Sequence, residues 1–136
     1  MGGTFSKEER AAMRAALAEA KAAKEGADLA AACQASIAAM SGSDRELAEA
    51  VHELVTTHTS LRPKTWYGMP AYTNADGKVV VFFQSAAKFK VRYATIGFQE
   101  AAHLDEGNFW PTSYAVSKLS AADTKQLVAL LKKAVE

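Results

Sequence analysis

Hydrophobic and polar positions follow one another along this chain first with the spacing of helices and then with that of strands. Up to about residue 59 the apolar residues recur every three or four positions, which is typical of amphipathic helices. Between residues 65 and 118 short apolar and aromatic runs are separated by turn residues, which is typical of strands. Helical spacing returns after residue 120. Helices, then strands, then a helix predict an α+β fold and not an alternating βαβ fold.

The first part of the chain predicts three helices. Ser6 followed by Glu9 is a capping box that opens an alanine-rich helix to about residue 25, with few large apolar residues. Gly26 interrupts the pattern, and a second helix is expected from residue 27. Ser43 followed by Glu46 predicts the start of a third helix, ending near residue 59. The apolar faces of the second and third helices are Leu29, Cys33, Ile37 and Met40, and Leu47, Val51, Leu54 and Val55.

The second part predicts an antiparallel sheet of about four strands with helices packed on it. The expected strands are 65–73, 78–84, 88–95 and 112–118. The Asn-Ala-Asp-Gly sequence at 74–77 predicts a hairpin loop. Ser120 and Asp123 form a capping box that opens the last helix. We therefore expect an appended N-terminal helix, residues 1–26, and an α+β domain, residues 27–136.

Composition bears on the partners and the cellular location of the protein, but it does not indicate a function. A net charge of +1 gives no global field that would recruit nucleic acid or an anionic membrane. The single cysteine, Cys33, excludes an intramolecular disulfide and lies in an apolar stripe, which predicts a buried and inert thiol. No apolar run reaches the roughly 18–20 residues of a membrane span, and the N-terminus lacks a signal-peptide core. The expected location is therefore the cytoplasm, without membrane contact. Met1–Ser6 matches an N-myristoylation pattern, but no second anchoring signal, which stable attachment would need, lies nearby.

The histidines and carboxylates are the candidate metal ligands of this chain. His52 and His58 are six residues apart, about 120° around a helix, so they do not form a zinc-protease motif. Glu46, Glu49 and Glu53 lie at i, i+3 and i+7, opposite the apolar face of their helix. Carboxylate oxygens suit hard cations such as iron or magnesium, whereas a solvated helix face would show the same pattern.

No motif for enzymatic catalysis is present. The sequence contains neither a G-x-S-x-G nucleophile elbow nor a glycine-rich phosphate loop of the G-x-G-x-x-G or G-x-x-x-x-G-K-[ST] type. No acid and base pair is marked by its local sequence. We therefore expect a protein without enzymatic activity and name no catalytic residue or cofactor.

The segment from residue 62 to residue 93 is both basic and aromatic, with six Lys or Arg residues and one acid. Lys88, Lys90 and Arg92 alternate with apolar residues on the predicted strand 88–95, which would give it one cationic face. Such a face could dock an acidic protein or bind single-stranded nucleic acid. Nucleic acid is the less favoured partner, because the aromatic residues of this strand would point away from the cations.

The sequence Gly68-Met69-Pro70 implies a bulge, an edge or a close backbone approach within the first strand. Aromatic residues beside such an irregularity often line a ligand pocket. Trp66, Tyr72 and Trp110 are the candidate lining residues, with plain core packing as the alternative.

Several motifs together resemble a known bacterial family. Trp66-Tyr67-Gly68-Met69-Pro70-Ala71-Tyr72, then Gly77-Lys78-Val79, Phe82-Phe83, Lys88-Phe89-Lys90 and Trp110-Pro111-Thr112-Ser113 resemble the YdhG-like family, whose members are largely catalogued as a domain of unknown function. The resemblance extends from about residue 28 to the C-terminus and leaves the alanine-rich helix outside.

The resemblance implies a frataxin-like α+β sandwich. It also implies a function, since some members are described as intracellular iron chaperones and frataxin-like proteins bind iron weakly through surface carboxylates. In this chain only Glu46, Glu49 and Glu53 offer a suitable surface. The sequence thus predicts a module that binds iron weakly or docks an acidic partner protein, or alternatively a binder of small molecules in an aromatic pocket on the sheet.

Overall fold

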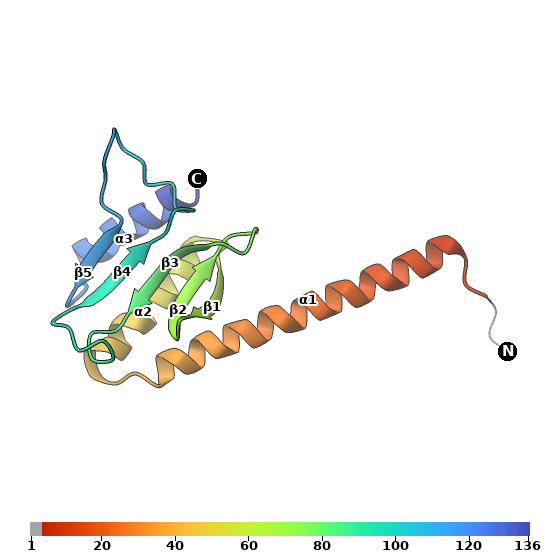
Figure 1. Cartoon of the computed structure of the whole chain (residues 1–136), viewed down its shortest axis with the longest axis horizontal. Coiled ribbons are helices and arrows are strands. Elements are labelled where there is room, and N and C mark those ends of the chain that lie inside the picture. Colours follow the sequence, from red (N-terminus) through yellow and green to blue (C-terminus); the bar gives the residue numbers. More distant parts are fainter. Residues whose placement is uncertain (1–3) are drawn as a thin grey trace.

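The computed structural model describes residues 4–136 and shows an α+β fold with three helices and five strands, one strand more than expected. The myristoylation pattern begins in residues 1–3, outside the described part of the chain. The elements in chain order are α1 (Lys7–Ala38), α2 (Gly42–His58), β1 (Arg62–Trp66), β2 (Met69–Thr73), β3 (Val79–Gln84), β4 (Ala94–Phe98), β5 (Ser113–Val116) and α3 (Ala121–Ala134). Figure 1 shows them along the chain. Within residues 4–136, no helix combines the length and apolarity that crossing a membrane requires.

α1 is one continuous helix, so the interruption predicted at Gly26 is wrong. Ser6 caps its N-terminus as predicted, because its hydroxyl accepts a hydrogen bond from the backbone of Glu9 at 3.0 Å. A glycine inside a helix costs only about 1 kcal/mol relative to alanine, and the strong helix formers on both sides outweigh that cost. The residues from 4 to 29 are all exposed, and Figure 1 shows this half of α1 projecting away from the rest of the protein.

α2 begins one residue after Ser41 and not at the predicted capping box. Ser43 lies inside the first turn, and no side chain caps the N-terminus at Ser41. The final helix does begin as predicted: Ser120 and Asp123 form a reciprocal capping box. Its hydrogen bonds from Ser120 lower the pKa of the exposed Asp123 carboxyl.

The predicted first strand is in fact two strands joined by a tight turn. Tyr67 and Gly68 have φ angles of 50° and 76°, and positive φ at both residues is what a two-residue hairpin turn of type I′ requires. The turn pairs Trp66 with Met69. Pro70 has no N–H to donate, and the pairing of β2 with β3 starts only at the next residue, Ala71.

The five strands form an antiparallel meander in the order β1-β2-β3-β4-β5. β3 and the hairpin loop at 74–77 are where the sequence predicts them, and β5 lies inside the predicted strand 112–118. The side chain of Asn74 closes the loop by accepting hydrogen bonds from the backbones of Asp76 and Lys78, both at 3.0 Å.

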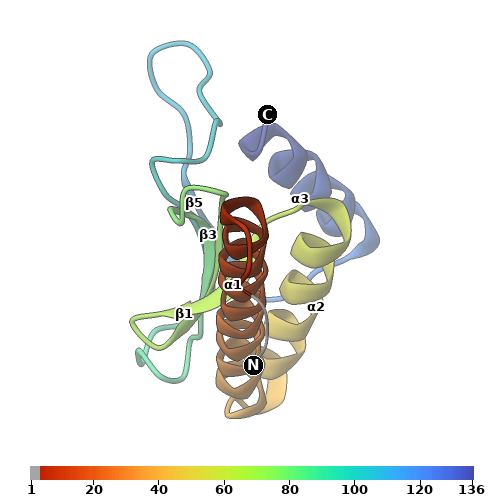
Figure 2. The ribbon, with the colours of Figure 1, turned by 90° about the vertical axis from the view of Figure 1, so that its right-hand side faces the viewer.

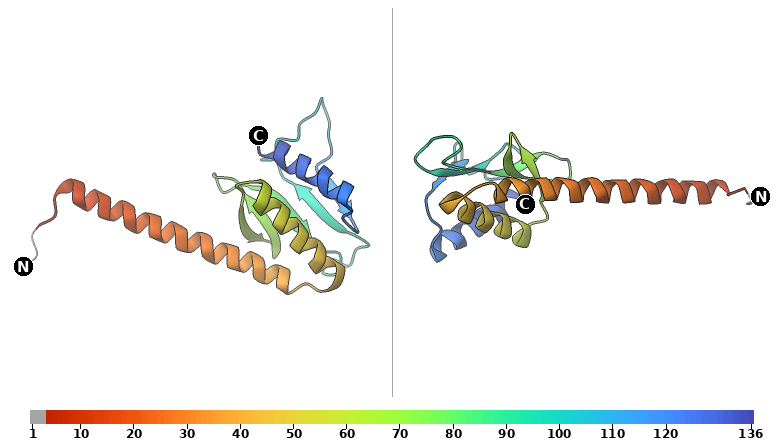
Figure 3. Two further views of the ribbon diagram at one scale, coloured as in Figure 1. Left: turned by 180° about the vertical axis from the view of Figure 1, so that it is seen from behind. Right: turned by 90° about the horizontal axis from the view of Figure 1, so that it is seen from below.

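Helices cover only one face of this sheet. Figure 2 shows the sheet on one side of α1 with α2 and α3 on the other, and the view from below in Figure 3 shows the same layers. The core lies between sheet and helices, and Cys33 is buried in it as predicted. Its largest fully buried side chains are Tyr72, Phe83, Ile37, Leu131, Val51, Val55, Val80 and Val81.

Candidate functional site

The pairing register identifies the residues on the bare face of the sheet. Directly paired residues of neighbouring antiparallel strands point to the same face. The pairs run from Lys64 to Ala71, Phe82, Gly97 and Ser113, and so cross all five strands. The neighbouring position on β2 is Tyr72, whose hydroxyl contacts α2. The row that begins at Lys64 therefore lies on the face opposite the helices, which we call the bare face.

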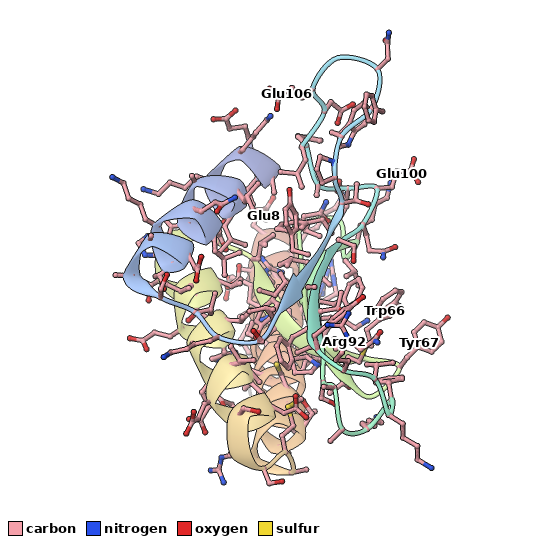
Figure 4. All side chains as sticks on the ribbon, turned by 90° about the vertical axis from the view of Figure 1, so that its left-hand side faces the viewer. Glu8, Trp66, Tyr67, Arg92, Glu100 and Glu106 are labelled. Atoms are coloured by element: carbon pink, nitrogen blue, oxygen red, sulfur yellow. The ribbon has the colours of Figure 1, made fainter. Side chains whose placement is uncertain are left out.

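Aromatic rings lie across the bare face. The rings of Trp66 and Phe82 are 5.3 Å apart between centroids, and both are half-buried. Tyr67 meets Trp66 edge-on at 4.9 Å and is 79% exposed. Figure 4 shows Trp66 and Tyr67 projecting from the side of the sheet that faces away from the helices. We call Trp66, Tyr67 and Phe82 the aromatic platform.

Gly97 makes room for the Phe82 ring of the platform. A Cβ atom at this position would stand 2.2 Å from the tip of the Phe82 ring. The ring therefore occupies the space that any other residue at 97 would fill. The small side chain of Ala71, which is paired with Phe82, leaves comparable room on β2.

Cations border the platform. Arg62, Lys64 and Trp66 occupy every second position of β1, and because side chains two apart in a strand share a face, all three point to the bare face. At the Tyr67–Gly68 turn, the Lys88 ammonium would lie 2.6 Å from a Cβ placed on Gly68. Figure 4 shows Arg92 on the same side of the sheet as Trp66. We call Arg62, Lys64, Lys78, Lys88 and Arg92 the basic rim.

A groove of about 900 Å³ opens beside Trp66. Arg62, Lys64 and Lys78 line one part of it, and Asp76 and Glu100 line another. Its wall is built from the start of β1, the hairpin loop at 74–77, the segment after β4 and the end of α3. The groove thus combines an aromatic surface with three cations and two acids.

The three predicted pocket residues do not meet in one pocket. Trp66 lines the groove, but Tyr72 is fully buried on the opposite face of the sheet, and Trp110 packs half-buried against the hydrophobic core. The single pocket expected for Trp66, Tyr72 and Trp110 is therefore wrong. The turn at Tyr67–Gly68, which the sequence pattern did not indicate, places Trp66 and Tyr72 on opposite faces of the sheet.

The predicted cationic strand at 88–95 is also wrong, because residues 86–90 form a turn and β4 begins only at Ala94. Val91 donates to the carbonyl of Ala86 at 3.0 Å, and Lys90 donates to that of Ala87 at 3.2 Å. With Lys90 at a φ of 53°, this is the Schellman pattern that ends a helical turn. Lys88, Lys90 and Arg92 are all exposed, on a loop and not on one face of a strand.

Asp44 anchors this loop to α2. Its carboxylate is almost buried and accepts hydrogen bonds from the backbones of Ala86 and Ala87, both at 3.0 Å. These two groups are the free N–H donors at the start of the helical turn. The anchor spans more than 40 residues of sequence, so no local pattern indicates it.

Asp44→Ala is expected to lower the free energy of unfolding by about 2–3 kcal/mol, because two backbone donors lose a charged acceptor. Urea unfolding followed by circular dichroism measures the change. Asp76→Ala is the matched control, since the exposed Asp76 side chain makes no hydrogen bond or ion pair within residues 4–136. Its effect is expected to stay within about 0.5 kcal/mol. Equal stability of the two variants would contradict the anchoring role.

The carboxylates proposed for iron do not form a ligand set. Glu46, Glu49 and Glu53 are all exposed on α2, and Glu49 pairs with Arg45 at 2.9 Å. In the part of the chain that the structure describes, no three acidic, histidine or cysteine side chains are grouped closely enough to hold a metal ion.

A polar relay lies on the helix side of the sheet, with Cys33 and Tyr72 buried, His52 half-buried and Gln34 exposed. His52 places Nδ1 3.0 Å from the Tyr72 hydroxyl and Nε2 2.9 Å from the Gln34 side-chain amide. The Tyr72 hydroxyl also lies within hydrogen-bonding reach of the Cys33 thiol. One consistent arrangement has Gln34 donating to Nε2, Nδ1–H donating to the Tyr72 oxygen and the Tyr72 hydroxyl donating to sulfur. The relay ties α1, α2 and β2 together.

Burial shifts the proton equilibria of this relay. It raises the pKa of the Tyr72 phenol, and the neighbouring Cys33 adds to the rise. It raises the pKa of the Cys33 thiol, although hydrogen bonds from Tyr72 and the Ala71 backbone oppose that rise. It lowers the pKa of His52. Because Cys33 and Tyr72 have no exposed surface, a substrate would not reach them, and the relay is structural.

The alternation of Arg62, Lys64 and Trp66 is a feature that the sequence interpretation missed. It was detectable once Tyr67 and Gly68 are recognised as a turn, because β1 then extends back to residue 62. Lys88 and Arg92 lie on a loop that Asp44 holds against α2. Because this contact is between residues far apart in sequence, no local pattern indicates their position.

Comparisons with models of protein families, with curated proteins and with solved structures find nothing that matches this chain. The function is therefore inferred from the geometry of the site.

Proposed function

We propose that this protein is a binding module that recognises an anionic partner through the bare face of its sheet. The observation that carries the proposal is that Arg62, Lys64 and Trp66 occupy successive positions on that face, beside the groove. Cations and an aromatic surface lie side by side there, with no helix of residues 4–136 covering them. The relay around Tyr72 has no such access.

The charge distribution supports an anionic partner. Residues 62–93 hold six Lys or Arg residues and one acid, whereas the whole chain carries only +1. The positive charge is therefore concentrated in the segment that builds the bare face and its neighbouring loop. A local field of this kind increases the rate at which oppositely charged partners associate.

A small anionic ligand is a second candidate, because the groove volume of about 900 Å³ falls within the range of small-molecule sites. It would use Trp66 as its apolar surface and Arg62, Lys64 or Lys78 as its counter-charge. Saturable binding of small anions in the groove, with no binding of polyanions, would favour this candidate over a macromolecular partner.

Iron carriage, which the family resemblance implies, has less support. Weak surface binding at Glu46, Glu49 and Glu53 would need carboxylates that converge, and the described residues show no such group. We therefore derive no step that involves iron. The location in the cytoplasm remains a prediction from the sequence.

Reversing two charges of the basic rim tests the proposal. The Arg62→Glu/Lys64→Glu variant is expected to bind immobilised heparin or polyglutamate about tenfold more weakly than the wild type, a change of roughly 1.4 kcal/mol. Salt-gradient elution and titration measure it. The matched control is Lys125→Glu with Lys132→Glu, two exposed cations on α3, on the other side of the protein. Equal losses in both double variants would show that only net charge matters and would contradict a site on the bare face.

A further inference from the structure

We infer that the anionic partner is single-stranded nucleic acid, with bases stacked on the aromatic platform and phosphates held by the basic rim. The inference rests on the proposed function and names the partner of that same face. Three features of the bare face support it: the exposure of Tyr67 in the platform, the spacing of the cations, and the presence of cations and aromatic rings on the same face.

Tyr67 is the clearest sign that the platform serves a ligand. It occupies a left-handed backbone conformation, with a φ of 50°, which disfavours a bulky residue. Its side chain is 79% exposed, so packing within the protein offsets little of that cost. The ring stands edge-on to Trp66, and the Phe82 ring packs against Trp66 at a tilt of 56°. An exposed aromatic face supported in this way suits an unpaired base, since every base has a flat π-face.

The cations are placed to follow a phosphate backbone. Arg62 and Lys64 are two residues apart on β1, which separates their positions by about 6.6 Å. That distance is comparable to the separation of successive phosphates in an extended strand. Lys88 continues the rim beyond the Tyr67–Gly68 turn, and Lys78 lies at the other end, in the groove. A rim that flanks the platform at both ends can hold more than one phosphate, so a chain fits better than a mononucleotide.

Cations and aromatics share one face of the sheet, which reverses the argument from sequence against nucleic acid. That argument placed the aromatic residues of strand 88–95 opposite its cations. The structure replaces this strand by a turn and puts Arg62, Lys64 and Trp66 on the same face of β1. A duplex would use only the rim, because its bases are stacked inside the helix. An acidic peptide would likewise leave the platform unused.

Binding is tested first with the whole protein and four probes. Fluorescence anisotropy at low salt compares a labelled twelve-nucleotide oligothymidylate with an abasic strand of equal length, a duplex and polyglutamate. We expect the oligothymidylate to bind about tenfold or more tightly than the abasic strand, as stacking of one or two bases would give. Equal affinity for the abasic strand or the duplex would overturn the inference.

Variants then locate the site. Trp66→Ala and Tyr67→Ala are each expected to weaken oligothymidylate binding by about 5- to 100-fold and to leave polyglutamate binding within about twofold. The matched control is Phe109→Ala, which removes a ring that is 92% exposed but lies outside the platform, in the β4–β5 loop. In a Trp110→Phe background the fluorescence of Trp66 should be quenched by oligothymidylate. Unchanged fluorescence and unchanged affinity of both platform variants would also overturn the inference.

Salt dependence separates the two levels of the proposal. Arg62→Ala with Lys64→Ala is expected to reduce the slope of log K against log salt by about 1.4 for the single strand, or roughly 0.7 for each lost phosphate contact. If all polyanions bind alike and Trp66→Ala changes nothing, the anionic partner stands and nucleic acid is ruled out. If no polyanion binds, both the anionic partner and the single-stranded nucleic acid are ruled out.

Discussion

Gly97→Ala is expected to lower the free energy of unfolding by about 1–3 kcal/mol, the usual cost of overpacking. The added methyl would stand 2.2 Å from the nearest atom of the Phe82 ring, and two further ring atoms lie within 3 Å. The ring would have to turn away from β4 and towards Trp66, which already packs against it at 5.3 Å. The same variant should therefore weaken binding at the platform as well as stability. Urea unfolding and oligothymidylate titration measure the two effects.

Gly26→Ala is the matched control for this change, since nothing lies within 4 Å of a Cβ at that position in the exposed part of α1. Alanine there should increase helicity and leave the unfolding free energy unchanged or raised by up to about 1 kcal/mol. If alanine lowers the free energy of unfolding at position 97 and raises it at position 26, the space around Phe82 decides the outcome, and not the loss of glycine itself. A neutral Gly97→Ala would contradict the close packing of the ring.

The fold class was predictable because its strongest signals are local. The apolar run of β3, the Asn-Ala-Asp-Gly loop and the Ser120–Asp123 capping box each specify their structure within a few residues, and all three are confirmed. The strand count was not predictable from alternation alone. Residues 65–73 give the pattern of one strand with an irregularity at Gly68-Met69-Pro70, whereas the positive φ of Tyr67 and Gly68 divides them into two strands.

Other errors arose where distant contacts override a local pattern. Lys88, Lys90 and Arg92 alternate with apolar residues as a strand would, yet Asp44 from α2 caps the first residues of a helical turn there. Gly26 shows the reverse case, because strong helix formers on both sides carry α1 through a residue that usually ends helices.

The candidate site was predictable only in part, because the face on which each of its residues lies depends on the pairing register of the strands. Trp66 is the predicted pocket residue that lies on the bare face, whereas Tyr72 lies on the other face and Trp110 packs half-buried against the core. A strand residue changes face with a shift of one position, so the faces of Trp66 and Tyr72 could not be assigned before the turn between β1 and β2 was known.

The relay on the helix side of the sheet leads to the second prediction. Tyr72→Phe is expected to lower the free energy of unfolding by about 1–3 kcal/mol, because a buried thiol and a half-buried imidazole both lose their hydrogen-bond partner. The ring and its packing are kept, so a cavity does not contribute. Urea unfolding at pH 7.5 measures the loss, and a neutral result would contradict the relay.

The same relay should make stability depend on pH through His52. Burial lowers its pKa in the folded protein, whereas the unfolded chain binds this proton near pH 6.5. Above about pH 6.5 neither state binds it and the stabilisation is complete. As the pH falls below that value the unfolded chain is protonated first, so the unfolding free energy decreases until the pH passes below the folded pKa. Unfolding measured at pH 7.5 and 5.5 should show this decrease in the wild type and a smaller one in His52→Gln. An identical pH dependence in His52→Gln and in the wild type would show that the proton uptake lies elsewhere.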